Sequence, residues 1–219
     1  RIEFKSFGAI AQCAIAHHFI LTTGAYVCYN YLNSVEGRND MVYMFLANGF
    51  EEVEALCPLD LLRRAGVEVT LVGVGGDNIC GSHKIVVSTD MPEIMYSDSS
   101  PEMLIFPGGM PGADNLDKSR TVSSAIKAAH RKGAYLCAIC AAPMILGKRG
   151  ILDGKRATCF PGFEKYLNGA TVTGQGVEVD GNIITAKGMG VAFDFGLALV
   201  EALKGKEVAE KIKASVFAR

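Results

Sequence analysis

Two cysteines three residues apart stand in the stretch "AYLCAICAAPMIL" at positions 134–146. Cys137 and Cys140 have C-x-x-C spacing, which suits a redox dithiol or half of a metal site. A lone nucleophilic thiol or simple core packing would explain the same residues, because free cysteine behaves as a small hydrophobe. The elements that surround the two cysteines must decide among these four interpretations.

Cys140 stands between a predicted strand, "AYLCAI", and a predicted helix, "AAPMILGKRG". Such a junction forms a sharp elbow that exposes its side chain at the top of the sheet, near the N-terminus of the helix. The helix dipole and free N–H groups there favour the thiolate, the reactive form of cysteine. We therefore expect Cys140 in a sparsely allowed backbone conformation, with a lowered pKa.

Cys137 lies within the predicted strand, so alternation of side chains should send it to the face opposite Cys140. A thioredoxin-like dithiol instead needs both cysteines at the start of a helix. The spacing therefore disfavours redox or metal C-x-x-C chemistry, and leaves Cys140 as either a nucleophile or a packed thiol.

Two other loops could complete a site around Cys140. The "PGG" at Pro107–Gly109 places glycines where a backbone can approach a ligand, and its N–H groups could stabilise an oxyanion; taken alone, the motif is better explained as a plain turn. Glu54 lies early in a predicted helix, in an apolar neighbourhood. Its neighbours Glu51 and Glu52 are most simply solvated partners of the helix dipole.

The elements that position these loops begin at residue 41. "MVYMFLA", "EEVEALCPLDLLRRAG" and "VEVTLVGVGG" predict a strand, a helix and a strand. The pattern resumes with "EMLIFPGG", "SRTVSSAIKAAHRKG" and the elements around Cys140, then short strands at "RATCF" and "ATVTG", a hairpin at "GVEVDGNIITA", and two closing helices, "VAFDFGLALVEALKG" and "KEVAEKIKAS". Continuous apolar strands between helices indicate an α/β fold: a flavodoxin-like, doubly wound, mostly parallel sheet sandwiched by helices, with a nucleophile elbow. Ligands bind such sheets beyond the carboxyl ends of the strands, where all three loops fall.

Composition excludes some classes of function. The 219 residues carry a formal net charge of -1 and 49% hydrophobic residues, which gives no general attraction to nucleic acid. Seven cysteines without a paired framework predict free thiols in a reducing compartment, so we expect a cytoplasmic protein.

Residues 1–40 differ from the rest of the chain. Polar residues interrupt their apolar stretch, so neither a spanning helix nor a signal peptide fits, and we expect no membrane association. We interpret 1–40 as an appended extension of unknown role and 41–219 as one domain. We expect the extension to pack poorly against that domain.

The motifs together resemble a known family. "FLANGFEEVEALCPLDLLRRAGVEVTLVG", "LIFPGGMPGADNL", "LCAICAAPMIL" and "KGMGVAFDFGLALVEALKG" are similar to the ThiJ/PfpI family, in particular its parkinsonism-associated protein deglycase branch and close bacterial relatives. The resemblance covers residues 41–219 in the expected order. It implies a flavodoxin-like fold, a homodimer, and no metal or organic cofactor.

The resemblance also implies roles for particular residues. Cys140 is the elbow nucleophile and redox-sensitive thiol, and Glu54 is the protonated carboxyl that hydrogen-bonds its sulfur. Gly108, Gly109 and Ala141 supply backbone groups nearby.

This chain departs from the family pattern at several positions, three of which bear on the chemistry. Protease-like members carry a histidine directly after the elbow cysteine, where this chain has Ala141, so a proteolytic Cys–His pair is disfavoured. The human-type branch brings a histidine from a later loop, where this chain has Phe160, which leaves Glu54 to handle protons. His83 stands where an arginine often helps to form an anion site.

The family resemblance leaves two classes of function open. One is a glyoxalase- or deglycase-like enzyme, in which Cys140 attacks a reactive dicarbonyl such as methylglyoxal or a glycated adduct. The other is a redox sensor or stress chaperone in which Cys140 oxidises to a sulfinate. A role in thiazole biosynthesis finds no support, because the sequence contains no G-x-x-x-x-G-K loop.

Overall fold

The computed structural model describes residues 41–97 and 100–218. The predicted N-terminal extension therefore lies outside the described residues. Within the described ranges, none of the helices is long and apolar enough to cross a membrane.

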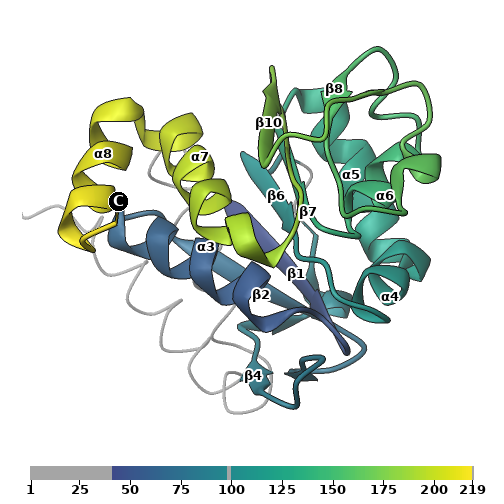
Figure 1. The fold of residues 1–219 in the computed structure, drawn as a ribbon. Helices are drawn as coiled ribbons and strands as arrows, with labels where there is room; N and C mark the ends of the chain where they lie inside the picture. The colour runs from purple at the N-terminus through teal and green to yellow at the C-terminus, as the bar shows by residue number, and fades with distance from the viewer. Residues whose placement is uncertain (1–40, 98–99, 219) are drawn as a thin grey trace, which may run out of the picture. The chain divides into compact units, whose positions relative to one another are not determined.

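A seven-stranded sheet forms the centre of the domain (Figure 1). Its strand order is β10-β11-β7-β6-β1-β2-β5, and every neighbouring pair is parallel except the antiparallel hairpin β10–β11. The strands are β1 Val42–Ala47, β2 Val69–Val74, β5 Met91–Pro92, β6 Met103–Phe106, β7 Tyr135–Ile139, β10 Val177–Asp180 and β11 Ile183–Ala186. This arrangement confirms the predicted parallel α/β sheet and the hairpin at Asp180-Gly181.

Helices cover both faces of this sheet. The apolar residues on one face pack with α3 Glu52–Arg64, α7 Ala192–Lys204 and α8 Lys206–Ser215 in one buried cluster. The other face carries α4 Gly112–Lys118, α5 Arg120–Lys132 and α6 Pro143–Gly147 (Figure 1). Because alternate side chains of a strand point to opposite faces, two covered faces require the nearly unbroken apolar strands seen in the sequence.

The smaller elements depart from the sequence-based expectation. "RATCF" and "ATVTG" form a separate two-stranded sheet, β8 Arg156–Ala157 with β9 Thr171–Val172, and do not join the main sheet. The sequence pattern did not predict α4, the hairpin of β3 Asn78–Cys80 with β4 Val86–Ser88, or β5. Nor did it predict three short 3-10 helices, η1 Glu93–Met95, η2 Glu164–Tyr166 and η3 Met189–Val191. Elements of two to seven residues carry too little periodicity to be recognised.

Gly196 sets the close packing of α7 against α3. A Cβ atom built on Gly196 would lie 2.6 Å from Leu61 Cδ1 and 2.9 Å from Pro58 Cα. The Pro58 contact is with backbone, which cannot move away as the end of a flexible side chain can. The approach of the two helices therefore depends on the missing side chain.

We predict that Gly196→Ala lowers the free energy of unfolding by about 1–3 kcal/mol through overpacking. The same change at an exposed helical site would raise stability by about 1 kcal/mol. Urea unfolding measures the effect of Gly196→Ala. The difference between Glu201→Ala and Glu201→Gly gives the glycine-to-alanine effect at an exposed position of the same helix. A Gly196→Ala protein as stable as the native chain would contradict this account.

Candidate active site

Cys140 occupies the junction between β7 and the loop into α6. Its φ is +65°, in the left-handed region that a residue other than glycine seldom adopts. The Cys140 N–H donates to the carbonyl of Ala186 (2.8 Å), and the Cys140 carbonyl accepts from the N–H of Phe160 (2.8 Å). Both backbone groups are thus held by segments far away in the sequence, which compensates the cost of the strained conformation. The predicted elbow is confirmed.

Cys137 is fully buried in the core cluster on the α3 and α7 face. Cys140 packs against this same cluster, so the expectation that the two cysteines take opposite faces is wrong. The positive φ of Cys140 interrupts the alternation of the strand. Cys140 lies beyond the end of β7 whereas Cys137 lies within it, so the two do not share the start of a helix as a thioredoxin-like dithiol requires.

Glu54 lies in the first turn of α3 and is 1% exposed. The Gly108 N–H donates to Glu54 Oε2 (3.0 Å), and the Cys140 thiol hydrogen-bonds the same carboxyl group. A Cβ on Gly108 would lie 2.6 Å from both Cys140 Cβ and Glu54 Oε2, so only glycine fits between them. The loops after β1, β6 and β7 therefore converge on one site.

Burial raises the pKa of Glu54 to about 7, partly opposed by the hydrogen bond from the Cys140 thiol. The nearby Glu51 carboxylate raises it further. Glu54 is therefore poised to gain or lose a proton near neutral pH, as a general acid–base group must.

The pKa of Cys140 is raised, contrary to the lowered value expected from the sequence. Burial, then the charge and hydrogen bonding of the Glu54 carboxylate, raise it to about 12, against the lowering effect of the Gly109 and Ala141 N–H groups. The following helix α6 has only five residues, so its dipole contributes little. Because the two groups share a hydrogen bond, the first proton lost belongs to the pair, and a proton that moves onto Glu54 leaves the thiolate behind.

The three backbone groups near Cys140 face different partners. The Gly108 N–H is directed at Glu54, whereas the N–H groups of Gly109 and Ala141 hydrogen-bond the Cys140 sulfur. The Gly109 backbone has a φ of +84° and packs against the backbone of Gly49 and Glu51. Gly109 and Ala141 are therefore the donors that already point at the reactive atom.

Glu51 and Glu52 are not the solvated dipole partners that we expected. The Glu51 side chain caps α3 by accepting from the Glu54 N–H (2.8 Å). Glu52 is buried and accepts from the His83 N–H (2.6 Å), while its Oε2 lies 2.8 Å from His83 Nδ1. Burial would raise the pKa of Glu52, but hydrogen bonds, first from the His83 side chain and then from backbone N–H groups, lower it to about 2. The sequence offered no signal for this pair, because 31 residues separate its members.

Glu51, Glu52 and His83 also form the one group of described residues whose side chains could hold a metal ion, with their ligand atoms within 4.8 Å of one another. His83 is already paired with Glu52, and that carboxylate raises the pKa of His83. The expectation of a protein without metal or organic cofactor remains a prediction.

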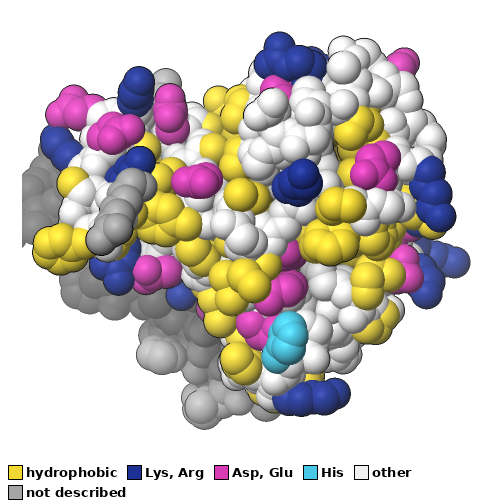
Figure 2. All heavy atoms as spheres, in the orientation of Figure 1, with side chains coloured by type: hydrophobic (Ala, Val, Ile, Leu, Met, Phe, Trp, Pro, Cys, Tyr) yellow, Lys and Arg dark blue, Asp and Glu magenta, His cyan; other side chains and the backbone are white. Residues whose placement is uncertain are grey.

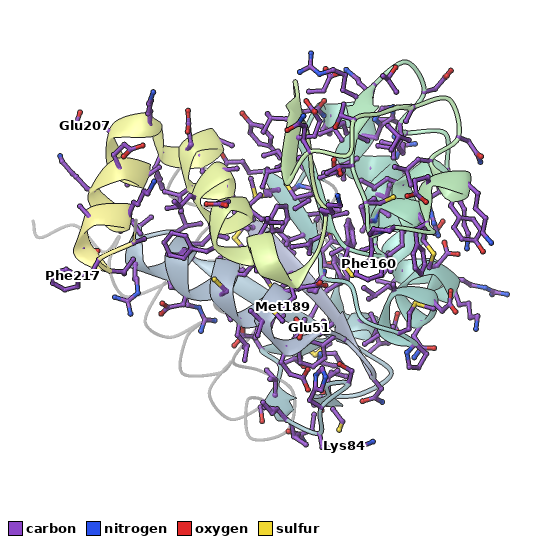
Figure 3. All side chains as sticks on the ribbon, viewed as in Figure 1. Glu51, Lys84, Phe160, Met189, Glu207 and Phe217 are labelled. Atoms are coloured by element: carbon purple, nitrogen blue, oxygen red, sulfur yellow. The ribbon has the colours of Figure 1, made fainter. Side chains whose placement is uncertain are left out.

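Exposed apolar side chains surround this site. Phe160 and Met189 are about half exposed, and a Cβ on Gly188 would lie 3.3 Å from the Phe160 ring and 4.0 Å from Glu54 Oε1. Figure 3 shows Glu51, Met189 and Phe160 in the same region of the domain. In the space-filling view, hydrophobic and acidic side chains lie side by side over the middle of this face (Figure 2).

The fold and this geometry define an α/β protein with a cysteine on a nucleophile elbow and a buried acid against its sulfur. The profile of the DJ-1/PfpI family matches residues 40–202. The chain belongs to this family and to its DJ-1 branch.

Individual relatives agree with this assignment. The chain is 35% identical over 179 residues to the Parkinson disease protein 7 homolog of Danio rerio, covering 80% of this chain and 95% of that one. Protein DJ-1 homolog B of Arabidopsis thaliana is 37% identical over 80% of this chain, which spans 40% of that longer relative. A relative from Caenorhabditis elegans, 31% identical over 72% of this chain and 84% of its own length, is named glutathione-independent glyoxalase DJR-1.2. The structure of oxidized Toxoplasma gondii DJ-1 superposes with a TM-score of 0.78 at 32% identity, over 81% of this chain and 98% of that one.

We predict that Glu54 controls the reactivity of Cys140. In the native chain, alkylation of Cys140 should rise with pH through an inflection near 7, because the pair loses its first proton there. Glu54→Gln and Glu54→Leu should move this inflection above the usual value of about 8.5 and slow alkylation at pH 7 at least about ten-fold.

Iodoacetamide labelling read by peptide mass spectrometry measures this, with Cys80 as the internal reference that should label alike in all three proteins. Identical profiles near pH 8.5 in the three proteins would make Cys140 an ordinary core thiol.

We also predict a pH-dependent effect of Glu54 on stability. Its pKa is raised above the unfolded value, so its contribution to stability is fully present below about pH 4.3 and is lost as pH rises through about 7. The free energy of unfolding of Glu54→Gln, relative to that of the native chain, should therefore rise by about 2–3 kcal/mol between pH 5 and pH 8.

Urea unfolding at the two pH values measures this gain, and exposed Glu201→Gln should show little change between them. An unchanged difference between Glu54→Gln and the native chain would mean that Glu54 ionises as it does in water.

Proposed function

We propose that this protein converts reactive dicarbonyls such as methylglyoxal into hydroxy acids, with Cys140 as nucleophile and Glu54 as proton carrier. The observation that carries the proposal is a buried carboxyl group with a pKa near 7, hydrogen-bonded to a thiol on a strained elbow. Such a carboxyl can take the thiol proton as the sulfur attacks and return it in a later step. The name of the C. elegans relative supports the same chemistry.

The chemistry balances without a cofactor. The Cys140 sulfur adds to the aldehyde carbon, its proton passes to Glu54, and the developing oxyanion faces the N–H groups of Gly109 and Ala141. Transfer of the aldehyde hydrogen, as a proton, to the neighbouring carbon oxidises the first carbon and reduces the second, which gives a thioester. Water then hydrolyses the thioester to lactate and frees the thiol.

The surroundings of Cys140 favour a small substrate and slow turnover. Phe160 and Met189 offer apolar surface beside Glu54, which suits the carbon skeleton of a dicarbonyl. Phe160 stands where the human-type branch brings a histidine, so Glu54 alone must serve each proton transfer. A glycated adduct on a protein or nucleotide would present the same carbonyl chemistry, and deglycase activity belongs to this proposal.

The second candidate function is a redox sensor or chaperone in which Cys140 oxidises to a sulfinate. The Glu54 carboxyl and the N–H groups of Gly109 and Ala141 could hold the added oxygens. The structural relative described as oxidized Toxoplasma gondii DJ-1 favours this alternative. We also propose that the chain is cytoplasmic, as its free thiols suggest, and forms a homodimer, as the family resemblance implies. Light scattering would test the dimer.

We predict that the full chain forms lactate from methylglyoxal, that Cys140→Ser forms none, and that Glu54→Gln is slower about 100-fold or more. Cys57→Ser, which changes a thiol outside the site, should keep the native rate. Proton NMR of the product measures lactate directly and avoids confusion with simple loss of the aldehyde by reaction with protein side chains.

The sensor hypothesis predicts a different pattern. The native chain would form no lactate beyond that of Cys140→Ser, while at least two equivalents of peroxide, one for each oxygen added, would convert Cys140 to the sulfinate, read as two added oxygen atoms by peptide mass. That outcome would exclude the enzymatic proposal and retain the sensor.

A further inference from the structure

A second cavity lies beside α5. Its volume is about 460 Å³, and its polar lining comes from Tyr96 and Ser97 after η1 and from Arg120, Thr121, Ser124 and Arg131 of α5. Small-molecule sites typically measure about 300–1,000 Å³. Neither the glyoxalase-like chemistry nor the redox alternative uses any of these residues.

The cavity is positively charged. Arg120 and Arg131 line it, and among the described residues of its lining none is acidic. Among the arginines in the described ranges, the other four pair with carboxylates: Arg63 with Asp90, Arg64 with Asp60, Arg149 with Asp117 and Arg156 with Glu178. Within those same ranges Arg120 and Arg131 form no such pair. The two guanidinium groups that keep their donors available for a ligand thus lie at one cavity.

The helix brings these side chains to one stripe. Residues 120, 124, 128 and 131 of α5 follow one another at helical spacing, so they lie along the same face. Ser124 and Thr121 place hydroxyl groups between the two arginines, and Ala125 and Ala128 leave room between them. Hydroxyl and guanidinium groups both donate hydrogen bonds to anionic oxygens.

The opposite wall is held in place by the core. The Tyr96 ring packs edge-on against Tyr43 (4.9 Å between centroids) and Phe45 (5.2 Å). Ser119 Oγ donates to Glu93 Oε2 (2.5 Å), which ties η1 to the start of α5. Glu93 is thereby engaged outside the lining, so this wall is held in place, and no described residue of the lining carries a charge that opposes an anion.

We propose that this cavity binds a small molecule that bears phosphate groups. Guanidinium groups recognise phosphate through paired hydrogen bonds, and two of them at one cavity suit a ligand with more than one anionic group. The compact volume favours a small molecule over an acidic polypeptide segment. Such a site would be independent of Cys140.

Inorganic pyrophosphate is the probe that we would titrate into the full chain by isothermal calorimetry, at low salt and at physiological salt. We expect saturable binding to one site per chain in the native protein. Arg120→Gln and Arg131→Gln should each weaken it at least about ten-fold, because each removes charge-assisted hydrogen bonds, and the double variant should abolish it.

Lys127→Gln is the matched control, since it removes the same charge from an exposed position of α5 that does not line the cavity. Both Lys127→Gln and Cys140→Ser should bind pyrophosphate as tightly as the native chain does. Thermal unfolding of each variant checks that the fold is intact. Absence of saturable binding, equal weakening by Lys127→Gln, or loss of binding in Cys140→Ser would each overturn the proposal.

Discussion

The strained backbone of Cys140 is the constraint on which the site depends. A residue with a side chain stays at a φ of +65° only where its surroundings hold it there. Here the Ala186 carbonyl and the Phe160 N–H bind the two backbone groups of Cys140 from two different segments. Without the sheet that places Ala186 next to β7, the chain would relax, and the sulfur would turn away from Glu54 and from the Gly109 and Ala141 N–H groups.

The same packing sets the proton chemistry. Glu54 is buried, and Gly108 leaves just enough space for its carboxyl to reach the Cys140 thiol. Burial raises the pKa of both groups, so charge on one disfavours charge on the other, and near neutral pH the pair carries at most one negative charge. A neighbour that can take the proton allows such a thiol to react as the thiolate. Both proposed functions, nucleophilic addition and stabilisation of an oxidised sulfur, rest on this property.

The first turn of α3 needs support of its own, because three glutamates lie within four residues. Each has a different partner: Glu51 caps the helix, Glu52 binds His83, and Glu54 meets Cys140. The bond between Glu52 and His83 also anchors the loop after β3 to the start of α3. Three glutamates within one helical turn thus have three different environments, and burial raises the pKa of Glu54 to about 7.

The parallel α/β sheet and the elbow at Cys140 could be predicted from the sequence pattern, and the pairing of Cys140 with Glu54 only from the family resemblance of the motifs. Long apolar strands alternating with amphipathic helices leave few other arrangements, and the quoted motifs recur in order over 41–219. Tertiary structure decided what depends on burial and on distant partners. The tertiary contacts hydrogen-bond Glu52 to His83 and direct the Gly108 N–H to Glu54. They also raise the pKa of Cys140, which the motif alone had led us to expect to be low. A pKa responds to the charges and the solvent within a few ångströms, and those neighbours come from segments that no local pattern connects.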